Sequence, residues 1–189
     1  MAHTVTLVRH GQTERSARKA YSGQLDIPLT DTGREQARRC AELLADAGID
    51  GIRTSPLVRA RDTAAAIAEA TGAPLTVDDR FIEVDYGPFE GLDRAGARAK
   101  YGQAFENWRA DPFGAPVPGM ETLDHALRRA RAATADALRD CEHPVIVGHQ
   151  GILRIVLVAL GELAPEDYFT RLLSEAEPVV VTAPAVVSA

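Results

Sequence analysis

The chain has 189 residues, enough to bury a substantial hydrophobic core without disulfides or metals. Hydrophobic residues make up 46% and charged residues 25%, which excludes a disordered chain and favours one folded domain over residues 1–189. The net charge of −6 excludes a surface built for nucleic acid or anionic lipid, because both need a basic excess, so any anion site must be a local basic pocket.

Two features bear on where the protein works. The N-terminal residues contain no basic stretch followed by a long apolar run, as a signal peptide would, and the longest apolar segment, residues 152–160, falls far short of the ~20 residues of a membrane span. Cys40 and Cys141 are far apart, and their spacing fits neither a zinc site nor a disulfide framework. We therefore expect a cytoplasmic protein with reduced thiols, without membrane or nucleic-acid partners.

Short apolar runs alternate along the chain with segments of helical periodicity. This alternation predicts the α/β class, with a three-layer α/β/α arrangement and a mainly parallel sheet flanked by helices. Beyond Ala183 we expect fraying. In chain order, the predicted elements are a strand at 5–8, a helix at 32–48, a strand at 49–54, a helix at 55–72, a strand at 74–77, a small cap insertion at about 85–120 over the carboxyl ends of the strands, a helix at 122–140, a strand at 144–147, a helix at 152–160 and a last strand at 178–181.

The starts of two predicted helices rest on local capping signals. Thr32 and Glu35 have the spacing of a capping box, in which each of the two side chains accepts a backbone N–H. Ser55 followed by Pro56 predicts the N-cap and the first residue of the next helix.

Two of the predicted strands end in a histidine. The strand at 5–8 leads into His10, which follows the permanent cation of Arg9, and the strand at 144–147 leads into His149. Parallel sheets bind ligands at the carboxyl ends of their strands, so if these two strands are neighbours, both imidazoles face one crevice. A structural or surface histidine is the alternative interpretation of each.

Other candidate residues are weaker when taken alone. Arg59 falls in the first turn of a predicted helix, whose N-terminus favours an anion, but the charge pattern does not choose it over Arg61, and a solvated helix face is the alternative. Glu83 lies in a loop, where a partly buried carboxyl could hold a proton near neutral pH; an exposed loop glutamate is the simpler interpretation. The five histidines lack ligand spacing such as His-x-x-x-His, so we expect no metal and no cofactor.

Several sequence blocks follow one another in a defined order along nearly the whole chain. They are Val8-Arg9-His10-Gly11-Gln12-Thr13-Glu14; Ser22-Gly23 through Pro28-Leu29-Thr30 with Gly33 and Gln36-Ala37; Ser55-Pro56-Leu57 to Arg59-Ala60 with Thr63-Ala64; Glu83 with Gly87 and Glu90-Gly91; and Gly148-His149-Gln150-Gly151. In this order the blocks resemble the histidine phosphatase superfamily, also called the phosphoglycerate mutase-like family.

The resemblance implies a role for each central residue. His10 would be phosphorylated, Arg9, Arg59 and His149 would hold the phosphoryl oxygens, and Glu83 would give a proton to the leaving group. These roles suit the chemistry, because neutral imidazole is nucleophilic near pH 7, cations stabilise the phosphoryl oxygens, and an alkoxide leaves poorly unless protonated. Further candidates for phosphate or substrate contacts are Gly11, Ser16, Ser22, Gly23, Gln150 and Tyr86.

The chain departs from the family pattern in two places. The family often has Trp-Asn where this chain has Arg15-Ser16; that asparagine commonly contacts phosphate, and Ser16 could replace it as a donor. Residues 119–122, Gly-Met-Glu-Thr, stand where the family has a Gly-Gly-Glu-Ser-like block in the segment that closes over substrate. Four aromatic residues could pack against the organic part of a substrate, although core packing explains them equally well: Tyr86, Phe89, Phe105 and Trp108.

These features predict a metal-independent phosphomonoesterase for a small-molecule phosphate ester. The modest insertion favours a phosphatase over a mutase, because cofactor-dependent mutases of the family carry longer insertions. A mutase would need extra basic residues over the site; Arg94, Arg98, Lys100 and Arg109 could serve, although a solvated helix face is the favoured interpretation of all four. A catalytically silent phosphate-binding or regulatory protein is the alternative of another class. The identity of the ester and the oligomeric state, monomer or homodimer, stay open.

Overall fold

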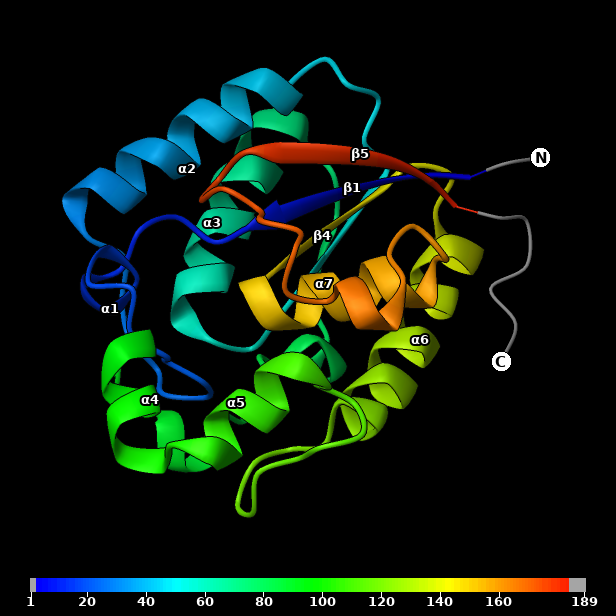
Figure 1. Ribbon diagram of the computed structural model, residues 1–189. Helices are drawn as coiled ribbons and strands as arrows, with labels where there is room; N and C mark the ends of the chain where they lie inside the picture. The colour runs from blue at the N-terminus through cyan, green and yellow to red at the C-terminus, as the bar shows by residue number, and fades with distance from the viewer. Residues whose placement is uncertain (1–2, 184–189) are drawn as a thin grey trace.

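The computed structural model describes residues 3–183, in which a central sheet lies between two groups of helices (Figure 1). The strands are β1 (His3–Arg9), β2 (Gly51–Thr54), β3 (Leu75–Val77), β4 (Pro144–Gly148) and β5 (Pro178–Ala183). The helices are α1 (Glu14–Ala17), α2 (Asp31–Leu44), α3 (Val58–Thr71), α4 (Arg94–Tyr101), α5 (Gln103–Ala110), α6 (Leu123–Asp140) and α7 (Gln150–Ala159), with short 3₁₀ turns at Asp79–Phe81, Gly87–Phe89 and Pro165–Asp167.

The strand order of the sheet is β3-β2-β4-β1-β5. Every neighbouring pair is parallel except β1 and β5, which are antiparallel. In this order, the connection that follows β1 runs toward β2, and the connection that follows β4 runs in the opposite direction, toward β5. The neighbouring strands β1 and β4 therefore flank a topological switch point, where open α/β sheets bind ligands. The prediction of a mainly parallel sheet is confirmed.

Both faces of the sheet are covered by helices. On β4, Val145 and Val147 pack into the cluster of buried residues that includes α2 and α3, whereas Ile146 packs into the cluster that includes α6 and α7. This alternation follows from the two-residue period of a strand, and it explains why β4 is apolar at successive positions: both of its faces are buried. The predicted three-layer α/β/α arrangement is confirmed.

The predicted capping box of the first long helix is wrong. Thr30 is the N-cap of α2, and its Oγ1 accepts the backbone N–H of Gly33 at 3.0 Å. Thr32 and Glu35 both lie inside the helix. The reason is a contact earlier in the chain: the backbone N–H of Thr30 donates to the carbonyl of Gln12 at 2.9 Å, which fixes Thr30 in the extended conformation of an N-cap.

The prediction that Ser55 caps the next helix is also wrong. α3 begins at Val58, and its N-cap residue, Leu57, makes no side-chain capping hydrogen bond. The hydroxyl of Ser55 lies 2.7 Å from Nε2 of His149 and accepts the N–H of Leu57 at 3.3 Å, so a tertiary contact has taken the side chain that the local signal assigned to the helix.

Other boundaries differ in smaller ways. The predicted start of the last helix at Ile152 is wrong, since Gln150 and Gly151 are already helical in α7. Helix α1 was not predicted from the sequence, and no helix bounds were predicted within the insertion at 85–120, where the structure has α4 and α5. The fraying predicted beyond Ala183 falls outside the described residues.

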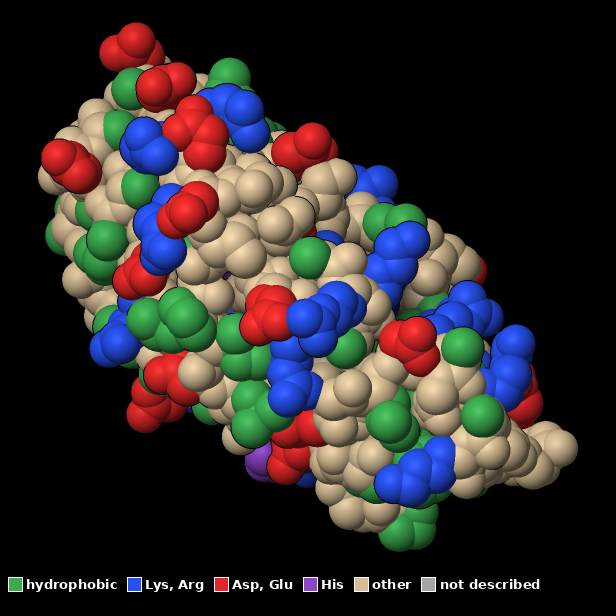
Figure 2. Space-filling view, turned by 90° about the vertical axis from the view of Figure 1, so that its left-hand side faces the viewer, with side chains coloured by type: hydrophobic (Ala, Val, Ile, Leu, Met, Phe, Trp, Pro, Cys, Tyr) green, Lys and Arg blue, Asp and Glu red, His purple; other side chains and the backbone are tan. Residues whose placement is uncertain are grey.

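The surface carries charges of both signs. On the face shown in Figure 2, Lys and Arg side chains (blue) are interspersed with Asp and Glu side chains (red). Within residues 3–183, none of the helices combines the length and the apolar character needed to cross a membrane.

Candidate active site

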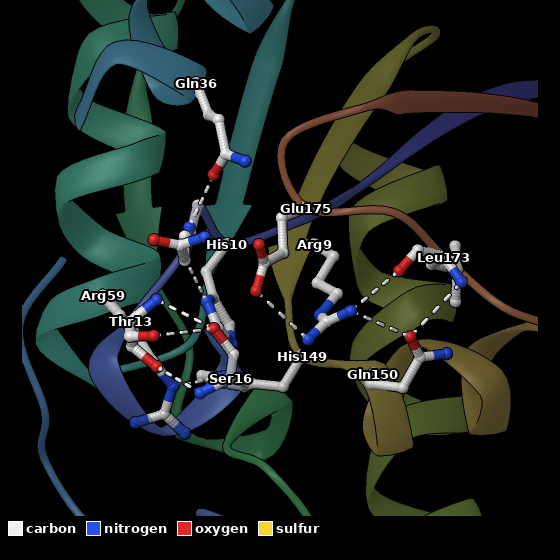
Figure 3. A network of polar contacts seen from close by, with 12 residues as sticks. Arg9, His10, Thr13, Ser16, Gln36, Arg59, His149, Gln150, Leu173 and Glu175 are labelled. Carbon is white, nitrogen blue, oxygen red and sulfur yellow. Dashed lines mark hydrogen bonds and ion pairs between the residues drawn. The ribbon is translucent and has the colours of Figure 1, made fainter. Parts of the chain in front are cut away.

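The pairing of β1 with β4 brings His10 and His149 together. Arg9, the last residue of β1, is in register with Gly148, the last residue of β4, and each histidine directly follows its strand. The backbone N–H of His10 donates to the carbonyl of Gly148 at 2.9 Å, and the two imidazole centroids are 5.1 Å apart. The two rings therefore lie beside each other at the carboxyl end of the sheet, as predicted from the sequence (Figure 3).

The ring of His10 has one nitrogen bound to protein. Nδ1 lies 2.7 Å from the carbonyl oxygen of Gly11, which can only accept, so Nδ1 carries a proton, and in the neutral ring Nε2 carries the lone pair. Burial, followed by the positive charges of Arg59 and Arg9, holds the pKa of His10 well below its ordinary value. His10 is thus a neutral imidazole with Nε2 available as a nucleophile.

His149 has the opposite tautomer. Nε of Arg59 donates to Nδ1 of His149 at 3.1 Å, and since a guanidinium only donates, Nδ1 carries the lone pair. Nε2 therefore holds the proton and donates it to Oγ of Ser55 at 2.7 Å. Burial, followed by the charge of Arg59, holds the pKa of His149 well below its ordinary value, so this ring is also neutral.

Arg59 is 1% exposed and lies in the first turn of α3, which decides the choice that the charge pattern left open. Besides His149, its guanidinium binds two backbone carbonyls, with Nη1 donating to Leu25 at 2.6 Å and Nη2 donating to Gly23 at 2.9 Å. Arg61 is exposed. The alternative of a solvated helix face is therefore wrong for Arg59, and Gly23 contributes through its backbone.

Glu83 is 5% exposed, so the interpretation as an exposed loop glutamate is wrong. Its Oε2 accepts the backbone N–H of Gly151 at 3.0 Å, and its Oε1 accepts the N–H of Ile152 at 2.8 Å and that of Val84 at 2.9 Å. Glu83 thus caps the N-terminus of α7 from a distant loop, which is why α7 begins two residues before the predicted start.

Gly151 is needed for this close approach. A Cβ at position 151 would lie 2.3 Å from the hydroxyl of Tyr86 and 2.7 Å from Oε1 of Glu83, closer than side-chain carbons come to other atoms. The glycine therefore lets a carboxyl and a phenol lie against the first turn of α7.

The guanidinium of Arg9 is held by the C-terminal segment and α7. Nη1 donates to Oε1 of Gln150 at 3.3 Å and to the carbonyl of Leu173 at 3.1 Å, and Nη2 lies 3.5 Å from Oε1 of Glu175 (Figure 3). Arg9 is therefore anchored by two protein oxygens on one side and faces a carboxylate on the other.

A cavity of about 630 Å³ opens over these side chains. Its lining includes His10, Glu83, Arg9 and Arg59. Among the further candidates from the sequence, four line it: Ser16, Ser22, Tyr86 and Gln150. Gly11, Gly23 and His149 are buried and do not line the cavity. Of the four candidate aromatic residues, only Tyr86 lines the cavity, whereas Phe89, Phe105 and Trp108 belong to the buried core.

The cavity is basic although the chain is acidic. Its six cationic side chains outnumber its two carboxyls, Glu83 and Glu175, and the two cations from α4 and α5 are Arg94 and Arg109. The interpretation as a solvated helix face is wrong for Arg109, which is half-buried in the lining, and it holds for Arg98 and Lys100, which are exposed and do not line the cavity. Arg94 is exposed and also lines the cavity. The cationic lining residues are Arg9, Lys19, Arg59, Arg94, Arg109 and Arg154.

Comparison with known proteins agrees with this arrangement. The family model described as "Histidine phosphatase superfamily (branch 1)" matches residues 5–183. The chain belongs to the histidine phosphatase superfamily.

Two relatives illustrate its place within the histidine phosphatases. Over 170 residues the chain is 34% identical to the 2,3-bisphosphoglycerate-dependent phosphoglycerate mutase 2 of Gloeobacter violaceus, covering 86% of this chain and 78% of the relative. Over 171 residues it is 38% identical to a bifunctional protein of Mycobacterium tuberculosis, covering 90% of this chain but 44% of that longer protein.

A solved histidine phosphatase has the same fold. The structure of the mycobacterial glucosyl-3-phosphoglycerate phosphatase in complex with VO3 aligns with a TM-score of 0.86 and 30% identity, over 95% of this chain and 90% of that one. Since a mutase and a phosphatase are both among the relatives, membership of the superfamily does not by itself choose between hydrolysis and transfer.

In this member of the superfamily, Ser16 stands where the family often has asparagine. Its Oγ accepts the N–H of Thr13 at 2.8 Å and donates to the carbonyl of Thr13 at 3.1 Å, closing the capping box of α1. The hydroxyl lines the cavity, but its proton is already used by the backbone.

Sequence reasoning missed several residues of the site. Thr63 joins two of the blocks, since its Oγ1 accepts the N–H of Gly11 at 3.1 Å and donates to the carbonyl of Arg59 at 2.8 Å. Arg154 had a signal, because it is the charged residue that interrupts the apolar segment 152–160. Glu175 had none. Within residues 3–183, no group of three His, Cys, Asp or Glu side chains is arranged to hold a metal ion.

Proposed function

We propose that this protein is a phosphomonoesterase that hydrolyses a small phosphorylated metabolite through a phosphohistidine on His10. The observation that carries the proposal is the neutral, buried imidazole of His10, whose Nε2 is free for attack beside the guanidiniums of Arg9 and Arg59 in a basic cavity. This combination supplies a nucleophile and fixed positive charge for a phosphoryl group in one place.

The reaction then has two steps. Nε2 of His10 attacks phosphorus, the bond from phosphorus to the ester oxygen breaks, and Glu83, in its protonated form, gives its proton to the leaving alkoxide. Water next attacks the phosphohistidine and gives up a proton to the Glu83 carboxylate, which releases inorganic phosphate and regenerates both residues. Arg9 and Arg59 stabilise the phosphoryl oxygens in both steps.

His149 needs a change of partner to take part. Both of its ring nitrogens are bound to protein, Nδ1 by Arg59 and Nε2–H by Ser55. To hold a phosphoryl oxygen, Nε2–H must exchange Oγ of Ser55 for that oxygen, while Arg59 keeps the ring in place at Nδ1.

We infer that the substrate carries a second anionic group, either a carboxylate or another phosphate. Arg154 is 7% exposed, lines the cavity and has no carboxylate within 4.0 Å among the described residues. A buried cation without a counter-ion is costly, and an anionic ligand group would offset that cost. Arg94 and Arg109 line the same cavity and would add to the attraction.

Mutase activity is the second candidate, and the same residues favour it. A mutase holds a bisphosphorylated intermediate while that intermediate reorients in the site. This calls for cations beyond those that bind the transferred group. Arg94 and Arg109 are placed for this, and the relative from Gloeobacter violaceus is named a phosphoglycerate mutase.

The test is phosphate release with excess chelator from two matched esters, 3-phosphoglycerate and glycerol 3-phosphate, which differ in one carboxylate. We expect the wild type to hydrolyse the carboxylate ester faster and His10→Ala to release no phosphate. His143→Ala, at the opposite end of β4, should behave as the wild type. Release by His10→Ala at the wild-type rate would disprove the phosphohistidine mechanism.

Other outcomes separate the alternatives. Interconversion of phosphoglycerate isomers without net release of phosphate would identify a mutase. Tight binding of esters without release or interconversion would identify a catalytically silent phosphate-binding protein.

A cytoplasmic location and a homodimer are further proposals, which cell fractionation and light scattering would test.

A further inference from the structure

The C-terminal segment places a carboxylate at the phosphoryl end of the cavity. Arg9 and Glu175 pair as an isolated parallel bridge, and the backbone N–H of Ala176 donates to the carbonyl of Arg9 at 2.8 Å. The side chains of Arg9 and Glu175 are 20% and 15% exposed, and both line the cavity. The backbone pairing thus fixes the Glu175 carboxylate beside a guanidinium that the proposed reaction needs (Figure 3).

One edge of the Arg9 guanidinium has no protein partner but Glu175 among the described residues, and an oxyanion can reach its Nε only when the groups over it move. Nη1 is taken by Gln150 and by the carbonyl of Leu173. Nε is buried and has no hydrogen-bond partner in the part of the chain that the structure describes, and Nη2 faces Glu175 alone across 3.5 Å. Nε and Nη2 together form the two-pronged edge that binds a phosphate or carboxylate through two parallel hydrogen bonds.

We propose that Glu175 favours product release, as a resident counter-ion on Arg9 that every phosphoryl group has to displace from this edge. One contact of 3.5 Å is long for a charge-assisted hydrogen bond, so a phosphoryl group that takes both Nε and Nη2 wins the competition. The carboxylate of Glu175 still lies beside the site afterwards and repels the bound anion.

This repulsion weakens the binding of substrate and product by a similar factor. A substrate is also held through the rest of its structure, including the second anion that we infer for it, so it still binds, whereas free inorganic phosphate has only the phosphoryl contacts. Glu175 therefore favours release of the product, as hydrolysis requires. Among the other ionisable groups near Arg9, Arg59 and Arg154 oppose this repulsion, and Glu83 is protonated when the product forms in the proposed reaction. The inference rests on the proposed function and explains how inorganic phosphate leaves the site after hydrolysis.

The experiment measures the dissociation constant of inorganic phosphate by calorimetry, which needs no turnover. Glu175→Gln keeps the shape of the side chain and removes its charge, and we expect it to bind phosphate about tenfold more tightly than the wild type. Glu175→Asp keeps the charge and should stay closer to the wild type. The control is Glu177→Gln, an exposed residue of the same segment with no ion pair among the described residues, which should leave phosphate binding unchanged.

Kinetics on the preferred ester supply a second readout. With Glu175→Gln we expect KM to fall about tenfold while kcat stays the same or decreases, because phosphate leaves more slowly. Phosphate binding that is unchanged or weaker in Glu175→Gln would overturn the proposal; weaker binding would mean that Glu175 orients Arg9. Equal effects of the Gln and Asp variants, or unfolding of Glu175→Gln, would also overturn it by showing a structural role.

The two proposals fail in different ways. Wild-type protein that hydrolyses esters, combined with a Glu175→Gln variant that binds phosphate no more tightly, would refute only the role of Glu175. Wild-type protein that neither binds phosphate nor hydrolyses any ester would refute the proposed function and the role of Glu175 together.

Discussion

Nε of Arg59 donates a hydrogen bond to Nδ1 of His149 at 3.1 Å, although 90 positions separate the two residues in the sequence. This contact fixes the tautomer of His149 and joins the start of α3 to the end of β4. Because the guanidinium also binds the carbonyls of Gly23 and Leu25, one buried side chain connects three separate parts of the chain around the cavity.

Replacing Arg59 with lysine should therefore damage catalysis severely. Lysine keeps the charge but has no rigid fork to hold His149 and two carbonyls together, so we expect Arg59→Lys to lower kcat/KM by about 10²–10³-fold. Arg61→Lys is the matched control, two positions along the same helix and exposed, and should leave kcat/KM within about twofold of the wild type. Equal effects of the two variants would contradict the assignment of Arg59.

The activity should persist into acid because His10 resists protonation. Burial, followed by Arg59 and Arg9, holds the pKa of His10 well below its ordinary value of about 6.5, and the neutral ring is the nucleophile. We expect the imidazole signals of His10 in an NMR titration of the free enzyme to stay unchanged as the pH falls to 6.5 and to shift only below it.

The matched variant for this titration is Arg9→Gln. It removes a positive charge near the ring, so the pKa of His10 should rise and the NMR transition should move to higher pH than in the wild type. A wild-type transition centred at or above pH 6.5 would show that His10 is not held neutral in this way.

Gly151→Ala tests the packing of Glu83 against α7. The new Cβ would lie 2.3 Å from the hydroxyl of Tyr86 and 2.7 Å from Oε1 of Glu83, so one or both must move. We expect kcat to fall by at least about 10²-fold, since the displaced carboxyl no longer meets the leaving group. If this mechanism is correct, adding Gly151→Ala to Glu83→Gln should cost little further activity; additive losses in the double variant would refute it.

Arg129 on α6 holds the backbone of the Glu83 loop. Its Nη1 donates to the carbonyl of Ile82 at 2.7 Å, its Nη2 to that of Glu83 at 3.4 Å, and its Nε pairs with Glu121 at 2.7 Å. Arg129→Met would leave the largely buried Glu121 without this partner, and should lower the free energy of unfolding by about 2–4 kcal/mol in denaturant titrations. Arg128→Met, an exposed neighbour, should change it by less than about 0.5 kcal/mol; equal losses would argue against the role of Arg129.

Much of the sheet could be predicted from the sequence because its signals are local. Residues 5–8 and 144–147 are short runs rich in β-branched side chains and apolar except for Thr6, and such runs bury both faces in a parallel sheet. Each run stops before a histidine, so the neighbouring, parallel arrangement of β1 and β4 is enough to bring His10 and His149 to one edge.

The positions of polar side chains were decided only by the tertiary structure. Ser55 has the local signal of a helix cap, yet its hydroxyl binds His149, and α7 starts early because Glu83 reaches it from a loop. Arg59 and Arg61 look alike in the sequence, but one is buried and the other is exposed.

The physical reason is the range of the contacts. Helical and strand periods report which neighbours along the chain share a face, so they located the strands, the longer helices and the two histidines of the site. The partners of Arg9 are 141 to 166 positions away, at Gln150, Leu173 and Glu175, and no local period encodes such distances. By itself the sequence determined the sheet and the end of it at which the two histidines lie. Only the folded chain decided which charges face the phosphoryl group.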